Sequence, residues 1–226
     1  ETERELAFRV NADAPAAMAA ACRDVGARLI HYSTDYVFDG RATSPYPVDA
    51  PVAPQGVYGE SKAAGEAAVL DARCEALVLR TAWVYALHGH NFLRTMLRLA
   101  GERDQLRVVD DQVGCPTPSW LIAEATVQAV RGAEPPRGVH HLVARGQTSW
   151  HGFAEAIMQE AARVGFISRS PMVIPISTDH YPTPARRPAY SVLDVSSLEH
   201  ELGTTLPTWR CALTDTFDRA QGEPAY

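Results

Sequence analysis

The residue types and spacing best suited to chemistry belong to Tyr58 and Lys62, which stand four apart. Lys62 is the only lysine in a chain that carries 20 arginines. On a helix, residues four apart share a face, so the ammonium comes close to the phenol. A unit charge about 4 Å away is worth roughly 4 kcal/mol at an effective dielectric of about 20, which would lower the phenol pKa toward neutrality. The pattern predicts a general acid or base, with a surface Tyr/Lys pair as the alternative.

A second candidate stands where a predicted strand ends. Residues 28–33 read as a buried strand, and Thr34 follows directly. In an open α/β sheet, sites gather at the carboxyl ends of the strands. Thr34 is therefore predicted to belong to a functional site. The alternative is a capped turn that Asp39 and Gly40 close.

These residues need a layered scaffold to bring them together. An alanine-rich helix is predicted from Asp13 to Val25, ending at Gly26, and a second helix from Tyr58 to about Ala72. Strands are predicted at 28–33, 76–81, 106–109, 138–143 and 172–176, with further helices after Asn91, Ser119 and Ser149, near 196–202, and from Pro207 to Arg219. This alternation is typical of a parallel sheet with right-handed crossovers.

Length and composition set the class of protein. The chain has 226 residues, 46% of them apolar, and a net charge of −6, which disfavours nucleic acid or an anionic membrane as a partner. Four well-separated cysteines predict free thiols and no metal site, and adjacent His140 and His141 should point to opposite faces of a strand. No apolar run reaches the roughly 20 residues needed to span a bilayer. A cytoplasmic protein is expected.

A rigid loop carries two further cations. Arg186 and Arg187 lie among the prolines of the segment YPTPARRP. Two guanidinium groups held in such a loop suit a phosphate or diphosphate, which arginine binds in bidentate fashion. The alternative is a pair of arginines that are solvated or bound to carboxylates.

Several ordered blocks carry a resemblance to a known family. The blocks are HYSTDYVFDG, VYGESKAAGE, RTAWVY, DDQVGCPTPS, GVHHLVARGQTSW and YPTPARRPAYSVLD. Tyr-x-x-x-Lys after a strand that ends in Ser/Thr resembles the extended short-chain dehydrogenase/reductase superfamily. Within it, the blocks are similar to the dTDP-4-dehydrorhamnose reductase family across essentially the whole chain.

The resemblance implies roles for individual residues. Tyr58 would donate a proton to the 4-keto oxygen of a dTDP-sugar, with Thr34 sharing the hydrogen bond and Lys62 holding the nicotinamide ribose and lowering the Tyr58 pKa. The cofactor would be NADPH, or else NADH, and a homodimer stays open. Cofactor contacts are expected from Ser33, Tyr58, Lys62, Thr81 and Ala82, and substrate contacts from Asp35, Trp83, Arg186 and Arg187.

The implied fold is α/β, a Rossmann-like doubly wound parallel sheet with a smaller C-terminal α/β substrate-binding domain. Residues 1–143 would belong to the cofactor domain and 144–226 mainly to the substrate domain, with the loop 110–118 contributing to the latter. The family begins with a Gly-x-x-Gly-x-x-Gly turn that binds the cofactor pyrophosphate, and none of the 15 glycines here has that spacing. The N-terminal half of the cofactor domain is therefore expected to be absent from this sequence.

Two other functions remain open. A noncatalytic regulatory or binding subunit on the same scaffold would explain the missing glycine turn but not the joint presence of Thr34, Tyr58 and Lys62. An epimerase or dehydratase of the same superfamily would act on similar sugars, and the Arg186-Arg187 block favours the reductase over these.

Overall fold

A parallel sheet of three strands forms the centre of the structure, a computed structural model that describes residues 2–181 and 187–222. The strands are β1 (Arg28–Thr34), β2 (Glu75–Thr81) and β7 (Gly138–His141), in the order β1-β2-β7. In the register of β1 on β2, Thr34 is the partner of Thr81. The polar ends of two strands far apart in the sequence thus meet at one edge of the sheet.

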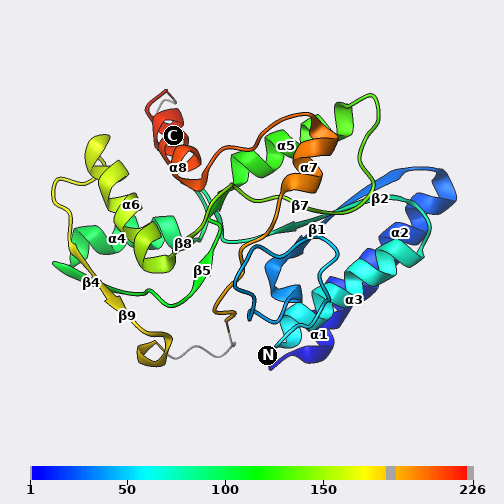
Figure 1. Ribbon diagram of the computed structural model, residues 1–226, viewed down its shortest axis with the longest axis horizontal. Helices are drawn as coiled ribbons and strands as arrows, with labels where there is room; N and C mark the ends of the chain where they lie inside the picture. The colour runs from blue at the N-terminus through cyan, green and yellow to red at the C-terminus, as the bar shows by residue number, and fades with distance from the viewer. Residues whose placement is uncertain (1, 182–186, 223–226) are drawn as a thin grey trace.

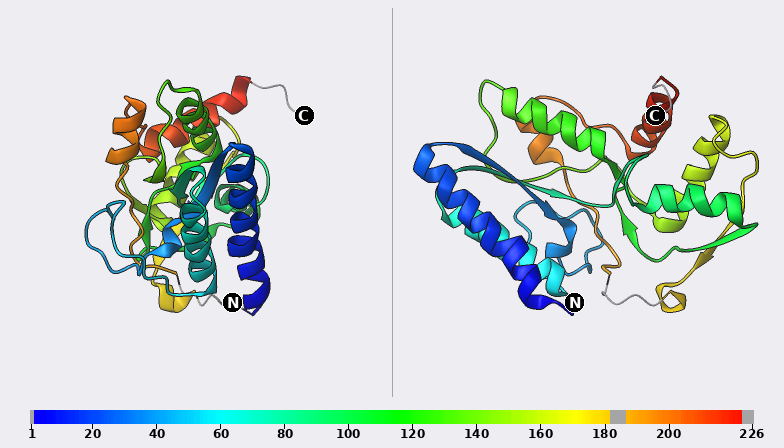
Figure 2. Two further views of the ribbon diagram at one scale, coloured as in Figure 1. Left: turned by 90° about the vertical axis from the view of Figure 1, so that its right-hand side faces the viewer. Right: turned by 180° about the vertical axis from the view of Figure 1, so that it is seen from behind.

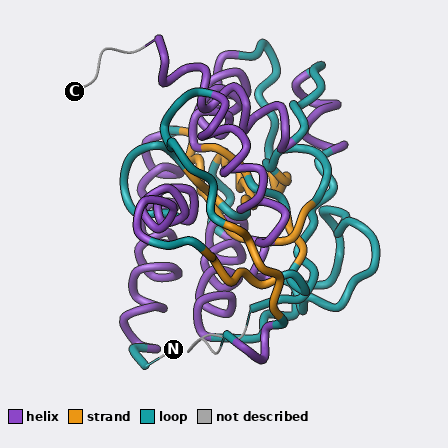
Figure 3. The backbone as a smooth tube through the Cα atoms, turned by 90° about the vertical axis from the view of Figure 1, so that its left-hand side faces the viewer, coloured by secondary structure: helices purple, strands orange, loops and turns teal. Residues whose placement is uncertain are grey.

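Helices cover both faces of this sheet (Figure 1). On one side lie α2 (Ala14–Val25) and α3 (Val57–Asp71), and on the other lie α5 (Ser119–Arg131) and α7 (Ser196–Leu202). Figure 3 shows the strands enclosed between helices and loops. Two covered faces explain why β2, the central strand, contains a continuous apolar run at residues 76–79.

The side chains of β2 show how the two faces are filled. Ala76 and Val78 pack with the apolar residues of α2 and α3, whereas Leu77 and Leu79 pack with those of α5. Successive strand residues point to opposite faces, so one strand supplies both cores. The predicted α/β fold with a parallel sheet is confirmed.

A second lobe lies beside the sheet (Figure 2). A parallel strand pair, β4 (Gln105–Val109) with β9 (Met172–Ile176), packs with α4 (Phe92–Glu102), α6 (Trp150–Arg163) and α8 (Trp209–Gly222). Phe153, Ile157 and Phe217 are fully buried in this core. The predicted cap at Asn91 is confirmed, because its side chain accepts a hydrogen bond from the Arg94 amide. The division into domains near residue 143 stays a prediction.

Short elements connect the two lobes. β3 (Val84–Tyr85) pairs in parallel with β6 (Thr117–Pro118), and β5 (Val113–Gly114) pairs in antiparallel fashion with β8 (Thr148–Ser149). The chain opens with α1 (Arg4–Phe8) and a π-helical turn, η1 (Arg9–Asp13), and it contains the 3₁₀ turns η2 (Asp35–Val37) and η3 (Thr178–His180).

The start of the first predicted helix is wrong. Asp13 makes no side-chain cap, because α1 and η1 already lead helical chain into α2. The predicted end is confirmed, since Gly26 adopts the left-handed conformation that favours glycine. Of the helices in the described part of the chain, none has the length and apolar character needed to cross a membrane.

Candidate active site

The first turn of α3 brings Tyr58 next to the end of β1. A Cβ added to Gly59 would lie 2.2 Å from the carbonyl oxygen of Tyr36, so only glycine lets the helix approach η2 this closely. The Tyr58 ring packs edge-on against Tyr36 at 5.6 Å. Thr34 ends β1, and its hydroxyl accepts a hydrogen bond from the Tyr36 amide. Thr34 and Tyr58, predicted to share a site, do lie together.

The pKa of Tyr58 departs from the sequence-based expectation. The residue is 46% exposed, yet desolvation of its phenol raises the pKa, Asp35 raises it further, and the hydrogen bond with Thr34 lowers it. The prediction that Lys62 lowers this pKa is wrong for this structure, because the ammonium is directed elsewhere. The phenol is therefore protonated at neutral pH and holds a proton that it can donate.

The Lys62 ammonium donates a hydrogen bond to the carbonyl oxygen of Tyr32 in β1, at 2.5 Å. Partial burial lowers the pKa of this lysine, and the nearby Glu66 carboxylate raises it. Lys62 therefore stands one helical turn beyond Tyr58, as the spacing predicts, and is held at the edge of the sheet.

A buried ion pair fixes α3 to the sheet one turn further along. Glu66 accepts hydrogen bonds from Arg80 of β2 at 2.7 and 3.0 Å, and each side chain is only 5% exposed. Arg80 also donates to the carbonyl of Val48 and lies over the Phe38 ring. Tyr58, Lys62 and Glu66 share one face of α3. The Glu66–Arg80 pair therefore fixes the position of the helix face that carries Tyr58, the candidate acid.

Unpaired polar atoms collect at the carboxyl edge of the sheet. The hydroxyls of Ser33 and Thr81 are buried there without a hydrogen-bond partner in the described chain, as is the Nε2 atom of His31 in the middle of β1. Burial and, to a smaller extent, the Lys62 charge lower the pKa of His31 to about 4, so the imidazole is neutral. Buried polar atoms normally have partners, so this edge fits a bound polar group. Ala82 is buried at the end of the same strand.

Asp35 is a buried carboxyl next to Thr34. It accepts a hydrogen bond from the Thr34 hydroxyl at 3.0 Å, while its Oδ2 atom has no partner among the described residues. Burial raises its pKa to about 6, while the Ser191 and Thr34 hydroxyls lower it. The free Oδ2 atom is an acceptor or donor for a ligand hydroxyl.

Trp83 presents an aromatic ring after β2. Its backbone is in the left-handed region, with φ of +47°, which is unusual for a bulky residue. The indole stacks on Trp150 with centroids 3.5 Å apart. Trp83 was predicted to line the sugar pocket, and the structure places it after Thr81 and Ala82 on the same strand end.

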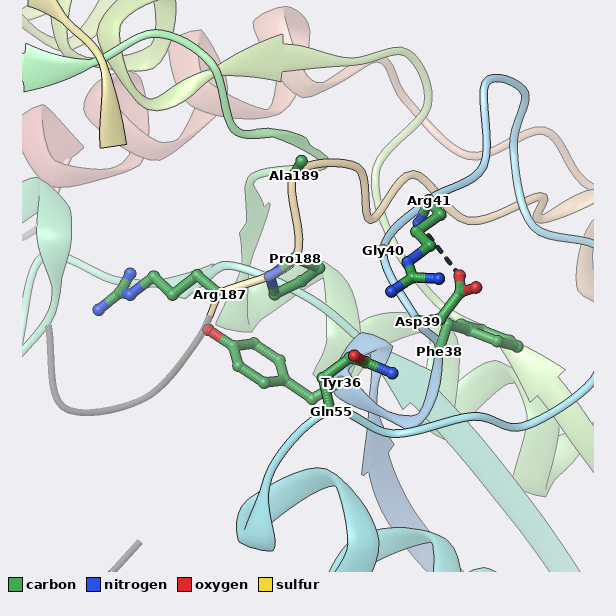
Figure 4. A pocket seen from close by; sticks show the side chains of 9 residues that line it. All are labelled: Tyr36, Phe38, Asp39, Gly40, Arg41, Gln55, Arg187, Pro188 and Ala189. Carbon is green, nitrogen blue, oxygen red and sulfur yellow. Dashed lines mark hydrogen bonds between the residues drawn. The ribbon is translucent and has the colours of Figure 1, made fainter. Parts of the chain in front are cut away.

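Arg187 lines two neighbouring hollows, whereas Arg186 lies outside the described residues. The smaller hollow, of about 130 Å³, includes Tyr36, Asp39, Arg41, Gln55 and Arg187. Figure 4 shows the Tyr36 ring directed toward Arg187, with Asp39 and Arg41 on the far side. Burial raises the pKa of Tyr36, and the Arg187 charge opposes this rise. Arg187 is therefore linked to the acid through the Tyr36 ring.

The larger cavity, of about 430 Å³, lies in the second lobe. It combines arginines with aromatic and aliphatic side chains, among them Phe92, Met96, Arg98, Leu99, Arg103, Arg107, Val108, Trp150, Tyr181 and Arg187. Ligand sites commonly pair an apolar lining with a few charged groups. An anionic ligand with a flat ring matches this lining.

Sequence reasoning missed three parts of this site. Glu66 continues the Tyr58 and Lys62 spacing by one turn, which is a visible signal, but its buried partner Arg80 was not foreseen. Trp150 lies inside a block that carried the resemblance, although nothing local indicates its contact with Trp83.

In the described ranges, no group of three or more His, Cys, Asp or Glu side chains is arranged to hold a metal ion.

Comparison with known proteins identifies relatives. Residues 1–221 match the family model described as RmlD substrate binding domain. The dTDP-4-dehydrorhamnose reductase of Burkholderia thailandensis is 45% identical over 225 residues, which cover 94% of this chain and 74% of that protein. The enzyme of the same name from Escherichia coli K12 is 43% identical over 213 residues, covering 93% and 71%.

Solved structures agree with these relatives. A dTDP-4-dehydrorhamnose reductase from Bacillus anthracis, in complex with NADP, matches 97% of this chain and 75% of its own with a TM-score of 0.90 and 34% identity. An orthologue from Clostridium acetobutylicum matches 98% and 76% with a TM-score of 0.89 and 38% identity. The chain thus spans about three quarters of the length of these proteins.

Proposed function

The chain belongs to the RmlD substrate binding domain family, and from this membership we infer that it acts as a dTDP-4-dehydrorhamnose reductase. The reaction converts the 4-keto group of dTDP-4-dehydro-L-rhamnose into the alcohol of dTDP-L-rhamnose. The observation that carries this function is the meeting of Thr34, Tyr58 and Lys62 at the carboxyl edge of the sheet. A hydroxyl, a phenol and an ammonium group that meet at this place suit a reaction in which a substrate oxygen gains a proton.

We assign the carboxyl edge of the sheet to a nicotinamide cofactor. When bound, NADPH supplies the hydride that adds to the C4 carbon of the sugar. We propose that Lys62 and Tyr58 hold the ribose of its nicotinamide end, and that Ser33, Thr81 and Ala82 line the same place. The unpaired hydroxyls of Ser33 and Thr81 support this assignment. NADH is the alternative donor.

Tyr58 supplies the proton. The O–H bond of the phenol breaks as the sugar oxygen gains its proton, and the resulting phenolate is reprotonated from solvent. The Thr34 hydroxyl donates to Asp35 in the structure, and we propose that its hydrogen turns to the same sugar oxygen when the substrate binds and so orients it. Because the pKa of Tyr58 is raised, the resting phenol is protonated and carries the proton that the sugar oxygen receives.

The rest of the substrate extends from the acid toward the second lobe. We place the sugar against Asp35 and Trp83, the diphosphate at Arg187, and the nucleoside in the larger cavity. This order is supported by the packing of Tyr58 on Tyr36, and by Arg187, which lines the smaller hollow together with Tyr36 and also lines the larger cavity. Arg186 belongs to the proposal on its charge and position in the sequence alone.

The proposal extends to location and partners. The thiols of Cys22, Cys74, Cys115 and Cys211 are free, as is usual in a reducing compartment, and we propose the cytoplasm. The net charge of −6 argues against nucleic acid as a partner. A homodimer is a further part of the proposal, to be checked by light scattering.

The direct test is consumption of NADPH, followed by absorbance, with a dTDP-4-keto-6-deoxy sugar as substrate. We expect the absorbance to fall with this substrate and to stay constant with dTDP-glucose, which lacks the keto group. An epimerase or dehydratase would convert sugar without net consumption of NADPH. A noncatalytic subunit would convert neither sugar, and either result would contradict the proposed reductase.

A further inference from the structure

The backbone of Trp83 and its neighbours together fix the position of the Trp83 indole. Its backbone is in the left-handed region, where a bulky side chain persists only if the surroundings impose it. Its carbonyl oxygen accepts a hydrogen bond from the Thr117 amide at 3.2 Å. The strained backbone and this hydrogen bond aim the ring in one direction.

The ribbon of β5 and β8 fixes the ring itself. A Cβ added to Gly114 of β5 would lie 2.5 to 2.8 Å from the Nε1, Cε2 and Cζ2 atoms of Trp83, so this edge of the indole lies directly on the glycine. Across the ribbon, Gly114 is the partner of Thr148, and Trp150 follows two residues later. The ribbon therefore contacts one edge of the Trp83 indole, and it leads directly into Trp150, the first residue of α6.

Trp150 covers that face. The two indoles are 5° from parallel with centroids 3.5 Å apart. Trp150 begins α6, and the cap at its start is closed by a hydrogen bond from the Gly152 amide to the Ser149 hydroxyl at 3.0 Å. The position of the Trp150 ring is thus set by a strand pair and a capped helix, both of them rigid elements.

Trp150 also reaches away from Trp83. It lines the larger cavity, contacts the Phe92 ring at 4.7 Å and lies under the Arg187 guanidinium at 5.9 Å. The same ring therefore belongs to the proposed nucleotide cavity and supports the proposed sugar wall. Aromatic pairs of this kind contribute beyond the area they bury.

We propose that Trp150 is a positioning residue, which acts on the reaction by holding the Trp83 indole where the sugar must stand beside Tyr58. The proposal rests on the reductase function given above. Without Trp150, the strained Trp83 backbone loses the ring that covers it, and the indole turns away. A reacting group displaced by about 1 Å can lose a factor of about 100 in rate, so the effect falls on kcat.

A double-mutant cycle tests whether Trp150 acts through Trp83. The full enzyme is made with Trp150→Ala, with Trp83→Ala and with both, and kcat is measured by NADPH absorbance with the dTDP-4-keto sugar. We expect Trp150→Ala to lower kcat at least about tenfold in the native background but less than about threefold when Trp83 is already alanine, since one displacement of the sugar accounts for most of the loss. Equal factors in the two backgrounds would overturn the proposal, as would a native kcat in Trp150→Ala.

Two further variants separate positioning from folding. Trp150→Phe keeps a flat ring and should recover most of the lost kcat, whereas Trp120→Phe removes an indole from α5 and should leave kcat unchanged. If Trp150→Ala does not fold, Gly114→Ala provides a second test. The added Cβ would clash with the edge of the Trp83 indole, so kcat should fall although Trp150 is intact. A native kcat in Gly114→Ala would then contradict the role of the ribbon.

Failure of this inference differs from failure of the reductase function. A native enzyme that consumes no NADPH with the keto sugar would refute the function itself. A native enzyme that is active, together with additive effects of Trp83 and Trp150, would refute only the positioning role.

Discussion

At the sheet, the acid and its neighbours are held by directional polar contacts, whereas at the second lobe the cavity is built from stacked rings with arginines at its rim. The side chains of Glu66 and Arg80 are each 5% exposed, whereas Arg187 is an exposed residue. Proton transfer needs a fixed distance between donor and acceptor, and buried ion pairs and hydrogen bonds define one. A nucleotide needs area and countercharge, which rings and solvated arginines supply.

The largest effect is expected from breaking the polar anchor of the sheet. Glu66→Gln leaves the Arg80 guanidinium buried without its countercharge and should lower the free energy of unfolding by about 3–5 kcal/mol. Urea denaturation measures the change. The control is Glu60→Gln. Glu60 lies on α3, as Glu66 does, and forms an exposed ion pair with Arg4 of α1, so this change should lower the free energy of unfolding by at most about 1 kcal/mol. Equal losses would show that burial does not distinguish the two pairs.

The buried carboxyl of Asp35 should make stability depend on pH. Its pKa of about 6 in the folded state lies above its ordinary value of 3.8, so the folded state binds the proton more tightly. The resulting stabilisation is present below pH 4 and is lost as pH rises through 6, a change of up to about 3 kcal/mol. Denaturation from pH 4 to pH 7 should therefore show the native protein losing stability relative to Asp35→Asn. A constant difference between the two would contradict burial of the charge.

Removal of the acid should leave the fold intact and stop the chemistry. Tyr58→Phe deletes one hydroxyl from a ring that is 46% exposed, and it should lower kcat about 100-fold or more. NADPH absorbance gives the rate. Tyr32→Phe, another exposed tyrosine, whose hydroxyl bonds to Thr126, should keep native kcat. Full activity in Tyr58→Phe would leave that residue a packing role only.

The sole lysine gives a finer comparison. Lys62→Arg keeps the charge, but a bulkier planar group does not fit the bond to the Tyr32 carbonyl, and kcat should fall at least about tenfold. Arg94→Lys, on an exposed position of α4, makes the reverse exchange and should change nothing measurable in steady-state kinetics. A native kcat in Lys62→Arg would mean that charge alone matters at this position.

The smallest effect is expected at the rim of the cavity. Arg187 is exposed, so Arg187→Ala should raise KM about fivefold with kcat nearly unchanged, and the difference from the native enzyme should shrink in high salt. Arg41→Ala, across the smaller hollow, should leave KM within about twofold if only Arg187 meets the diphosphate. A larger loss of kcat than of affinity would place Arg187 at the reacting end instead.

Much of the fold followed from local patterns. The strands at β1, β2 and β9 and the helix that carries Tyr58 agree with the periodicity and with the blocks that resembled the family. The first helix was started too late, since the turn η1 makes a continuous helix that no local cap signal shows. The contact of Gly59 with Tyr36 could not be read from the sequence either, because it joins η2 to α3 across a proline-rich loop.

By itself, the sequence determined that Tyr58, Lys62 and Glu66 share a helix face, because the helical period depends only on neighbouring residues. Only the tertiary structure decided what each of them meets: a buried edge for the phenol, the Tyr32 carbonyl for the ammonium, and Arg80 for the carboxylate. The pKa of Tyr58 rose where spacing predicted a fall, because desolvation depends on every segment packed around a group. The stack of Trp83 on Trp150 likewise arises from packing between residues distant in the chain.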